Sequence, residues 1–313
     1  MTIQPQTYLP RIGRRAFVAA AAGAALSLGI PRGGVAAGVP ILRPIPKSTQ
    51  KIPVVGMGTW ITFNVGASKR LRAARARVLK AFFDAGGTVI DSSPMYGSSE
   101  DVIGYCLDRI DRRDWLFSAT KVWTPLDDHG RSQMAQSRKL WGVPKFDLMQ
   151  VHNLVNWEGH LETIAEDKAA GRVHHIGITT SHGSRHSDMA RLMDDNRLDV
   201  VQFTYNLLDR EAERRLLPMA AERGLAVIVN RPFRRGELFR RFAGHKLPDW
   251  AGEFDCTNWA QFFLKFVVSH PAVTCAIPAT SRVDHMRENM GALYGKLPDA
   301  DLRARMIRHI ESL

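Results

Sequence analysis

The sequence predicts an α/β fold of the (β/α)8 TIM barrel class, a single domain that follows an N-terminal signal segment. Three observations support this prediction. Short apolar runs alternate eight times with amphipathic stretches, reactive polar residues stand at the ends of those runs, and no linker rich in Pro, Gly and Ser divides the 313 residues. A composition of 45% hydrophobic and 24% charged residues suits one soluble core.

The elements alternate regularly along the chain. After the first predicted strand, Leu71, Ala74, Val78 and Phe82 form one apolar helical stripe, and the other predicted helices lie between successive strands in the same way. The predicted strands are residues 54–58, 88–91, 115–120, 147–151, 174–178, 199–203, 225–229 and 273–277.

The formal net charge of +12 allows an anionic partner such as nucleic acid or an acidic membrane. The densest basic run, residues 69–80, lies opposite the apolar stripe, so we interpret it as a solvated helix face and expect no nucleic-acid partner. Cys106, Cys256 and Cys275 lack the spacing of a disulfide framework or a zinc site, and we expect no metal. Cys106 and Cys275 stand in apolar runs and are predicted to be small core residues.

Four residues at or just past predicted strand ends form a candidate catalytic set: Asp91, Tyr96, Lys121 and His152. In a parallel barrel such residues meet at one mouth. A phenol with a pKa of about 10 is a weak acid, so we expect the Lys121 ammonium, held by Asp91, to favour the charged form of Tyr96. His152 would orient a carbonyl oxygen or relay a proton. Taken singly, the same residues also suit a structural ion pair, a turn tyrosine and a core histidine.

With these residues the chain resembles the aldo-keto reductases. This resemblance is made specific by the D-x4-Y-G element, which runs from Asp91 to Gly97, together with the later Lys121 and His152. The matching stretches are residues 55–60, 91–100, 119–123, 150–153, 171–177, 202–208, 231–238 and 277–289. The resemblance implies a (β/α)8 barrel that transfers hydride from a nicotinamide cofactor to an aldehyde or ketone, with Tyr96 as the proton donor.

The resemblance also implies a cofactor-binding set. Its members in this sequence are Thr59, Thr179, Thr180, Gln202, Arg231, Arg282, Glu288 and Asn289. Thr179 and Thr180 replace a Ser-Asn pair of the family, so Thr180 cannot supply the carboxamide. Arg231 follows the seventh strand, where the family often has an aromatic residue, and its planar guanidinium is expected to stack on the nicotinamide.

The phosphate-binding element of the family is also altered. Ala279 replaces a lysine and His285 an arginine, while Arg282 and the amide groups that open the last helix remain available for an anion. The resemblance therefore implies NADP, as NADPH, with NAD possible.

Three tryptophans that follow strands, Trp60, Trp123 and Trp157, are expected to line the substrate pocket, although they can also fill core. Residues 234–257 are expected to cover it. The predicted partner is a small-molecule carbonyl compound. An alternative function is an exported redox-sensing or ligand-binding barrel that retains its cofactor without turnover, and the altered positions Thr180 and Ala279 support it.

Residues 1–37 have the three regions of a Tat-type signal peptide. Arg14 and Arg15 precede an apolar core at 19–26 and small residues that end at Ala37. The core is too short for a membrane span of about 20 residues. We predict Tat-type export to the periplasm and cleavage near Ala37, which leaves a barrel domain at 38–313 without stable membrane insertion. The net charge of that domain would be +8, because residues 1–37 hold four Arg and no acid. An uncleaved anchor or a disordered tail is the alternative.

Overall fold

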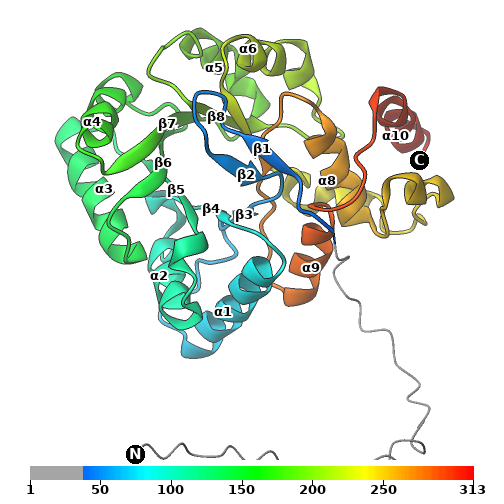
Figure 1. Ribbon diagram of the computed structural model, residues 1–313, viewed down its shortest axis with the longest axis horizontal. Coiled ribbons are helices and arrows are strands. Elements are labelled where there is room, and N and C mark those ends of the chain that lie inside the picture. The colour runs from blue at the N-terminus through cyan, green and yellow to red at the C-terminus, as the bar shows by residue number, and fades with distance from the viewer. Residues whose placement is uncertain (1–37) are drawn as a thin grey trace, which may run out of the picture. The chain divides into compact units, whose positions relative to one another are not determined.

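The computed structural model describes residues 38–313, so the predicted signal peptide at 1–37 lies outside the described residues. The described chain folds as eight parallel strands with helices around them, which confirms the predicted (β/α)8 barrel (Figure 1). The barrel strands are β3 (Met57–Gly58), β4 (Val89–Asp91), β5 (Phe117–Val122), β6 (Phe146–His152), β7 (Val173–Thr179), β8 (Val200–Thr204), β9 (Ala226–Asn230) and β10 (Cys275–Ala276).

The barrel closes where its last strand meets its first. The amide of Gly56 donates to the carbonyl oxygen of Ala276 at 2.8 Å, and an isolated parallel bridge joins Gly58 to Ala279. A Cβ atom on Gly58 would lie only 2.8 Å from the carbonyl oxygen of Ile277. A glycine at this position therefore permits the close approach that completes the barrel.

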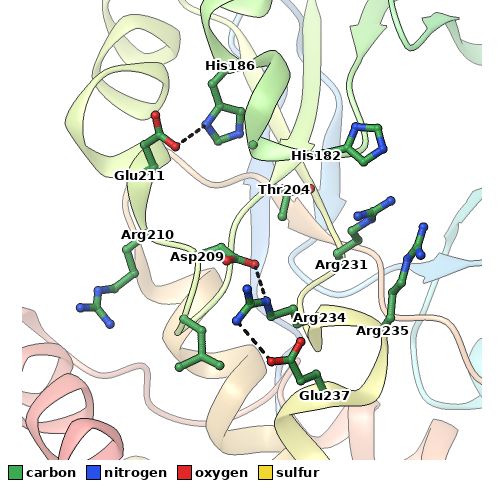
Figure 2. Close-up of a pocket in the computed structure, with 12 residues that line it drawn as sticks. His182, His186, Thr204, Asp209, Arg210, Glu211, Arg231, Arg234, Arg235 and Glu237 are labelled. Atoms are coloured by element: carbon green, nitrogen blue, oxygen red, sulfur yellow. Dashed lines mark ion pairs between the residues drawn. The ribbon is translucent and has the colours of Figure 1, made fainter.

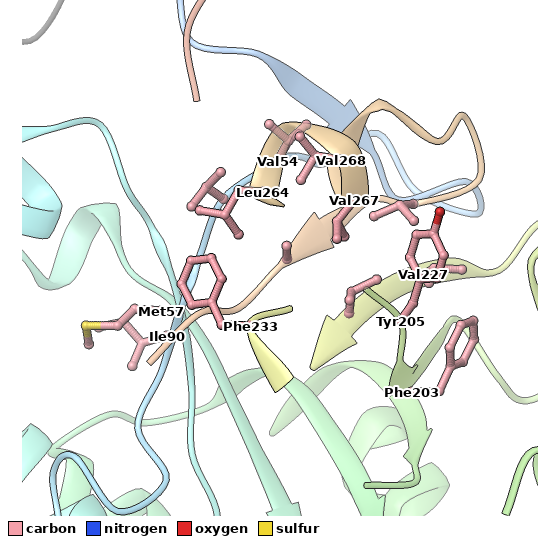
Figure 3. Packing of buried hydrophobic residues seen from close by; sticks show 14 of the residues in the cluster. Val54, Met57, Ile90, Phe203, Tyr205, Val227, Phe233, Leu264, Val267 and Val268 are labelled. Atoms are coloured by element: carbon pink, nitrogen blue, oxygen red, sulfur yellow. The ribbon is translucent and has the colours of Figure 1, made fainter. Parts of the chain in front are cut away.

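Helices cover the outside of the barrel (Figure 1). Val78 and Phe82 of the first helix are buried as predicted, and residues such as Val227 of β9 and Val267 further along the chain belong to the same outer core layer (Figure 3). The helices are α1 (Lys69–Asp84), α2 (Ser99–Ile110), α3 (Asp127–Trp141), α4 (Trp157–Ala169), α5 (His186–Leu192), α6 (Leu216–Glu222), α7 (Glu237–Arg241), α8 (Trp259–Ser269), α9 (Val283–Gly291) and α10 (Ala300–Ser312).

An antiparallel hairpin that was not predicted from the sequence lies across one end of the barrel (Figure 1). It consists of β1 (Leu42–Pro44) and β2 (Lys51–Pro53). Its Ile45 and Ile52 are buried in one cluster with inward-facing residues from the early part of the strands, such as Val89. The hairpin therefore plugs the N-terminal end of the barrel and leaves the opposite end as the mouth.

Alternation along the strands decides which side chains reach the mouth. In β6, Met149 and Val151 face the helices, while Leu148 faces the interior cluster. Because side chains in a strand alternate with a period of two, Gln150 and His152 also face inward, one layer higher each. The inner core is thus apolar at the N-terminal end, next to the hairpin, and polar at the mouth.

Several predicted strands have other bounds in the structure, and one of these differences moves a candidate site residue. The run predicted as 115–120 forms a strand only from Phe117, and it continues to Val122, so Lys121 lies within β5 and not after it. Trp115 belongs instead to the 3-10 turn η2 (Arg113–Trp115), where it is 49% exposed beneath the guanidinium of Arg112.

Candidate active site

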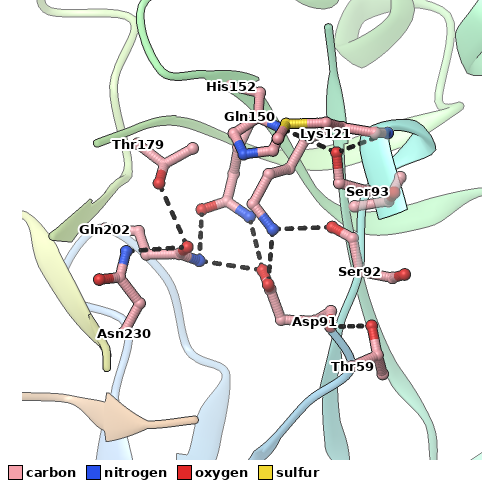
Figure 4. A network of polar contacts seen from close by, with 12 residues as sticks. Thr59, Asp91, Ser92, Ser93, Lys121, Gln150, His152, Thr179, Gln202 and Asn230 are labelled. Carbon is pink, nitrogen blue, oxygen red and sulfur yellow. Dashed lines mark hydrogen bonds and ion pairs between the residues drawn. The ribbon is translucent and has the colours of Figure 1, made fainter. Parts of the chain in front are cut away.

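The structure brings the four candidate catalytic residues together. Asp91 and His152 are the last residues of β4 and β6, and Lys121 is the last inward-facing residue of β5 (Figure 4). Tyr96 ends the 3-10 turn η1 (Pro94–Tyr96), which begins two residues after the end of β4. Three neighbouring strands and one short turn therefore converge on the same part of the mouth.

A buried ion pair lies at the centre of the set. The Nζ atom of Lys121 is 2.5 Å from Oδ2 of Asp91 and donates to the carbonyl oxygen of Ser92 at 2.7 Å. Burial acts to lower the pKa of Lys121, but the negative charge of Asp91 and the nearby Tyr96 raise it above its usual value. Lys121 therefore carries its positive charge inside the barrel.

Two glutamines hold the other oxygen of Asp91. Oδ1 accepts hydrogen bonds from Nε2 of Gln150 at 3.0 Å and from Nε2 of Gln202 at 2.9 Å (Figure 4). The hydroxyl of Thr59 donates to the backbone carbonyl of Asp91 at 2.9 Å. These donors fix the carboxylate, which in turn fixes the ammonium of Lys121.

The phenol of Tyr96 lies beside this pair. The Nζ atom of Lys121 is 5.1 Å from the centre of its ring. Burial of the hydroxyl raises the pKa of Tyr96, and the positive charges of Lys121 and Arg231 lower it by less. Lys121 therefore favours the charged form of Tyr96 as expected, but desolvation outweighs its charge and leaves the pKa of the phenol above the usual value.

His152 faces the same phenol edge-on, with 5.6 Å between the ring centres. Its Nδ1 atom is 2.7 Å from Oγ of Ser93, which also accepts a hydrogen bond from the amide of Met95. Burial, together with the charge of Lys121, lowers the pKa of His152 to about 2. The imidazole is therefore neutral, which suits orientation of an oxygen and not donation from an imidazolium.

Residues predicted for the nicotinamide end gather at the ends of β7, β8 and β9. The hydroxyl of Thr179 donates to Oε1 of Gln202 at 3.2 Å. Thr180 is fully buried, and its Oγ1 atom has no hydrogen-bond partner. Asn230, which was not among the predicted site residues, joins this group: its Nδ2 donates to the carbonyl oxygen of Thr180 at 2.8 Å. Its position as the last residue of an apolar run was the available signal.

Arg231 borders a cleft of about 500 Å3 between the loops that follow β7, β8 and β9 (Figure 2). It has a left-handed backbone, with φ of 52°. Burial lowers the pKa of Arg231, and the charge of Arg235 lowers it further. Because Arg231 borders this cleft, its side chain lies at the mouth of the barrel, as expected for a residue that follows the seventh strand.

The predicted phosphate-binding residues lie apart from this cluster, at and within α9. Arg282 precedes the helix and is exposed, with its Nε atom 3.0 Å from Oδ1 of Asp284. Glu288 is exposed, whereas Asn289 is buried. Arg282 is thus accessible to an anion only in competition with Asp284.

The three tryptophans predicted to line the pocket have different surroundings. Trp60 is half-buried, with the guanidinium of Arg235 4.4 Å from its ring centre. Trp123 borders a hollow of about 550 Å3 that also includes Pro94 of η1, while Trp157 borders a separate one of about 270 Å3. Their assignment to a single substrate pocket is therefore not supported for Trp157.

The segment 234–257 covers the mouth only at its start. Arg234 and Arg235 border the cleft, in the 3-10 turn η5 (Arg234–Gly236). Further on, in η6 (Asp249–Phe254), Trp250 packs against Phe262 of α8 and His309 of α10. The expectation that all of residues 234–257 cover the pocket is wrong, because the aromatic residues of this segment pack against helices beside the barrel.

Within residues 38–313, no group of three or more His, Cys, Asp and Glu side chains is placed to hold a metal ion. No helix in the same range is long and apolar enough to cross a membrane.

Comparisons with known proteins agree on one family. The model of the aldo/keto reductase family matches residues 54–307. An aldo-keto reductase of Strobilurus tenacellus is 27% identical over 269 residues, which cover 74% of this chain and 79% of that protein. The NADH-specific methylglyoxal reductase of Escherichia coli K12 is 23% identical over 321 residues, with 83% and 96% covered. The crystal structure of a Klebsiella pneumoniae aldo-keto reductase in complex with NADPH has the same fold, with a TM-score of 0.72, 23% identity, and 87% and 95% covered.

Proposed function

Because this chain belongs to the aldo/keto reductase family, a family of NAD(P)H-dependent oxidoreductases, we propose that it reduces a small aldehyde or ketone with NADPH. The observation that carries this proposal is the convergence of Asp91, Lys121, Tyr96 and His152 at the mouth of the barrel. A buried ion pair beside a protonated phenol and a neutral imidazole suits proton donation to a carbonyl oxygen.

The residues present fit a nicotinamide nucleotide. The unpartnered Oγ1 atom of Thr180 is a buried polar atom that a ligand amide would satisfy. Thr179 and Gln202 stand next to it, and Arg231 presents a planar cation at the same mouth. When bound, the cofactor supplies hydride to the carbonyl carbon.

The side chains of the protein supply the proton and the orientation. Tyr96 keeps its proton at neutral pH, since burial raises its pKa, and donates that proton to the carbonyl oxygen. The ammonium of Lys121 stabilises the phenolate that remains, and Asp91 keeps that ammonium in place. His152 uses Nδ1 for Ser93, so its Nε2 atom is left to orient the substrate oxygen.

The choice of NADPH over NADH depends on Arg282. A 2′-phosphate would draw this guanidinium away from Asp284 and form a charge-assisted pair with it. We expect NADPH to bind about tenfold more tightly than NADH, and the Arg282→Leu variant to lose most of that difference. Dissociation constants from fluorescence quenching test this, and equal affinities in the natural protein would exclude a phosphate-binding role for Arg282.

The activity itself is tested by NADPH oxidation with a panel of aldehydes, ketones and sugars. Multiple turnovers with at least one carbonyl compound, lost in the Tyr96→Phe variant, would support the reductase. Bound NADPH that persists through the whole panel would contradict it and favour a barrel that retains its cofactor. We propose the reductase because the acid–base set is complete.

A further inference from the structure

Ser93 contacts both the turn that carries Tyr96 and the ring of His152. It is fully buried, and its backbone carbonyl accepts a hydrogen bond from the amide of Tyr96 at 2.9 Å. Its hydroxyl caps the same turn by accepting from the amide of Met95 at 3.2 Å. The same hydroxyl oxygen is 2.7 Å from Nδ1 of His152 (Figure 4). One side chain therefore links the proposed proton donor to the imidazole beside it.

The hydrogen-bond inventory of this hydroxyl decides the direction of its contact with His152. A serine hydroxyl has one hydrogen to donate and lone pairs to accept with. The amide of Met95 can only donate, so it occupies a lone pair of Oγ. Within residues 38–313, Nδ1 of His152 is the only other polar side-chain atom that contacts Oγ. Because a buried hydrogen without an acceptor is costly, Oγ of Ser93 donates to Nδ1.

This direction fixes the tautomer of His152. The ring is neutral and therefore carries one hydrogen. Because Nδ1 accepts from Ser93, that hydrogen is on Nε2. In the part of the chain that the structure describes, Nε2 makes no hydrogen bond of its own. It can thus donate to a carbonyl oxygen, whereas the other tautomer would present a lone pair that repels the oxygen.

We propose that Ser93 is a positioning residue that selects the Nε2–H tautomer of His152, so that His152 and Tyr96 both present hydrogens to the substrate oxygen. This inference rests on the proposed reductase activity. The carbonyl oxygen gains negative charge as hydride reaches the carbon, and two aligned donors stabilise that charge better than one donor beside a lone pair. Because Ser93 also closes the turn that carries Tyr96, it aligns one donor with the other.

The tautomer is measured by NMR of the ring nitrogens in histidine-labelled protein, without substrate. The signals of His152 are those that disappear in the His152→Gln variant. We expect a hydrogen on Nε2 in the natural protein, and a substantial share of the Nδ1–H form in Ser93→Ala. A hydrogen on Nδ1 in the natural protein would overturn the inference, and so would an unchanged tautomer in Ser93→Ala. Because no turnover is needed, this result is independent of whether the proposed reductase activity is found.

Kinetics separate this role from a general loss of stability. Ser93→Ala should lower kcat about five- to fiftyfold and leave the dissociation constant for NADPH within about twofold. Ser118→Ala is the matched control. The buried hydroxyl of Ser118 also donates to one side chain and accepts from one amide, in this case Oδ2 of Asp147 at 2.9 Å and its backbone nitrogen at 3.1 Å. This variant should keep the natural kcat, and a natural kcat in Ser93→Ala would contradict the positioning role.

A double-mutant cycle identifies the group through which Ser93 acts. In a His152→Gln background, Ser93→Ala should change kcat by less than about twofold, because the tautomer that Ser93 selects is no longer present. A loss of the same size in both backgrounds would show that Ser93 acts through the turn of Tyr96 instead, and selection of the tautomer by Ser93 would then be refuted as a cause of the lower rate.

Discussion

Burial governs the ionisation of each residue in the candidate site. Lys121 is fully buried and keeps its charge because Asp91 lies 2.5 Å away and is itself held by two amides. The same burial keeps Tyr96 protonated and His152 neutral. At rest, the site therefore stores its transferable proton on the phenol, next to a cation that stabilises the product of its loss.

Replacing Tyr96 by Phe should reduce kcat by about 10²- to 10⁴-fold, because the variant lacks the proton donor. The dissociation constant for NADPH should change by less than about twofold, since Phe keeps the ring. Steady-state kinetics and fluorescence titration measure the two quantities. A variant that retained normal turnover would remove Tyr96 from the acid role.

The pH dependence follows from the same two residues. Tyr96 has a raised pKa, so its proton is present below that value and is lost only as the pH rises through it, above about 10. His152, with a pKa of about 2, stays neutral over the working range. The kcat for reduction should therefore be flat from about pH 5 to 9. A loss of rate that follows one ionisation near 6.5 would show that a charged histidine takes part.

The unpartnered hydroxyl of Thr180 allows a test in which one substitution is expected to raise the stability of the free protein and to lower its affinity for NADPH. Thr180→Val removes a buried oxygen without a partner, so it should stabilise the protein without cofactor by about 1 kcal/mol and weaken NADPH several-fold. Thr179→Val is the matched control, because it breaks a hydrogen bond to Gln202 and should destabilise the free protein by about 1 kcal/mol. Urea unfolding measures both changes. Destabilisation by both variants to the same extent would argue against a cofactor role for Thr180.

Among the elements, α2 is tied to its neighbours by one carboxyl group. Glu100 lies in its first turn and accepts hydrogen bonds from Thr120 at 2.6 Å, Ser137 at 2.9 Å and Trp141 at 3.1 Å. These partners belong to β5 and α3. Because η1 and Tyr96 come immediately before α2, the position of the proton donor depends on this anchor.

Glu100→Ala should lower the free energy of unfolding by about 2–4 kcal/mol, since it leaves several buried donors without an acceptor. Glu100→Gln keeps one acceptor oxygen and the shape, so it should cost less than half as much. Urea denaturation gives both values. If the two variants were equally stable, the hydrogen bonds of Glu100 would not be what secures α2.

For the whole molecule, the residues that plug the barrel lie at the opposite end from the candidate site. The hairpin plugs one end with Ile45 and Ile52, apolar side chains fill the interior above it, and the polar layer lies at the mouth. Residues that bind and react therefore occupy one rim, and the rest of the barrel holds that rim rigid. We propose that this domain is exported by the Tat-type signal at residues 1–37.

Export is tested by changing the twin arginines. Replacing Arg14 and Arg15 by Lys should keep the protein in the cytoplasm, because the paired arginines mark the signal. The single change Arg11→Lys lies in the same segment outside the pair and should leave export intact. Cell fractionation with mass measurement of the mature N-terminus reports both location and cleavage. Export of the double variant at the normal level would refute the assignment.

The sequence by itself determined the eight-strand pattern and the reactive residues at strand ends, because periodicity and position along a strand are local properties. Asp91, Lys121 and His152 could be placed at one rim in this way. The raised pKa of Tyr96, the contact of Asn230 with Thr180 and the separate hollow beside Trp157 were decided by the tertiary structure. Each of these depends on burial and on which side chains from distant strands and loops face one another, and no pattern within one segment encodes that.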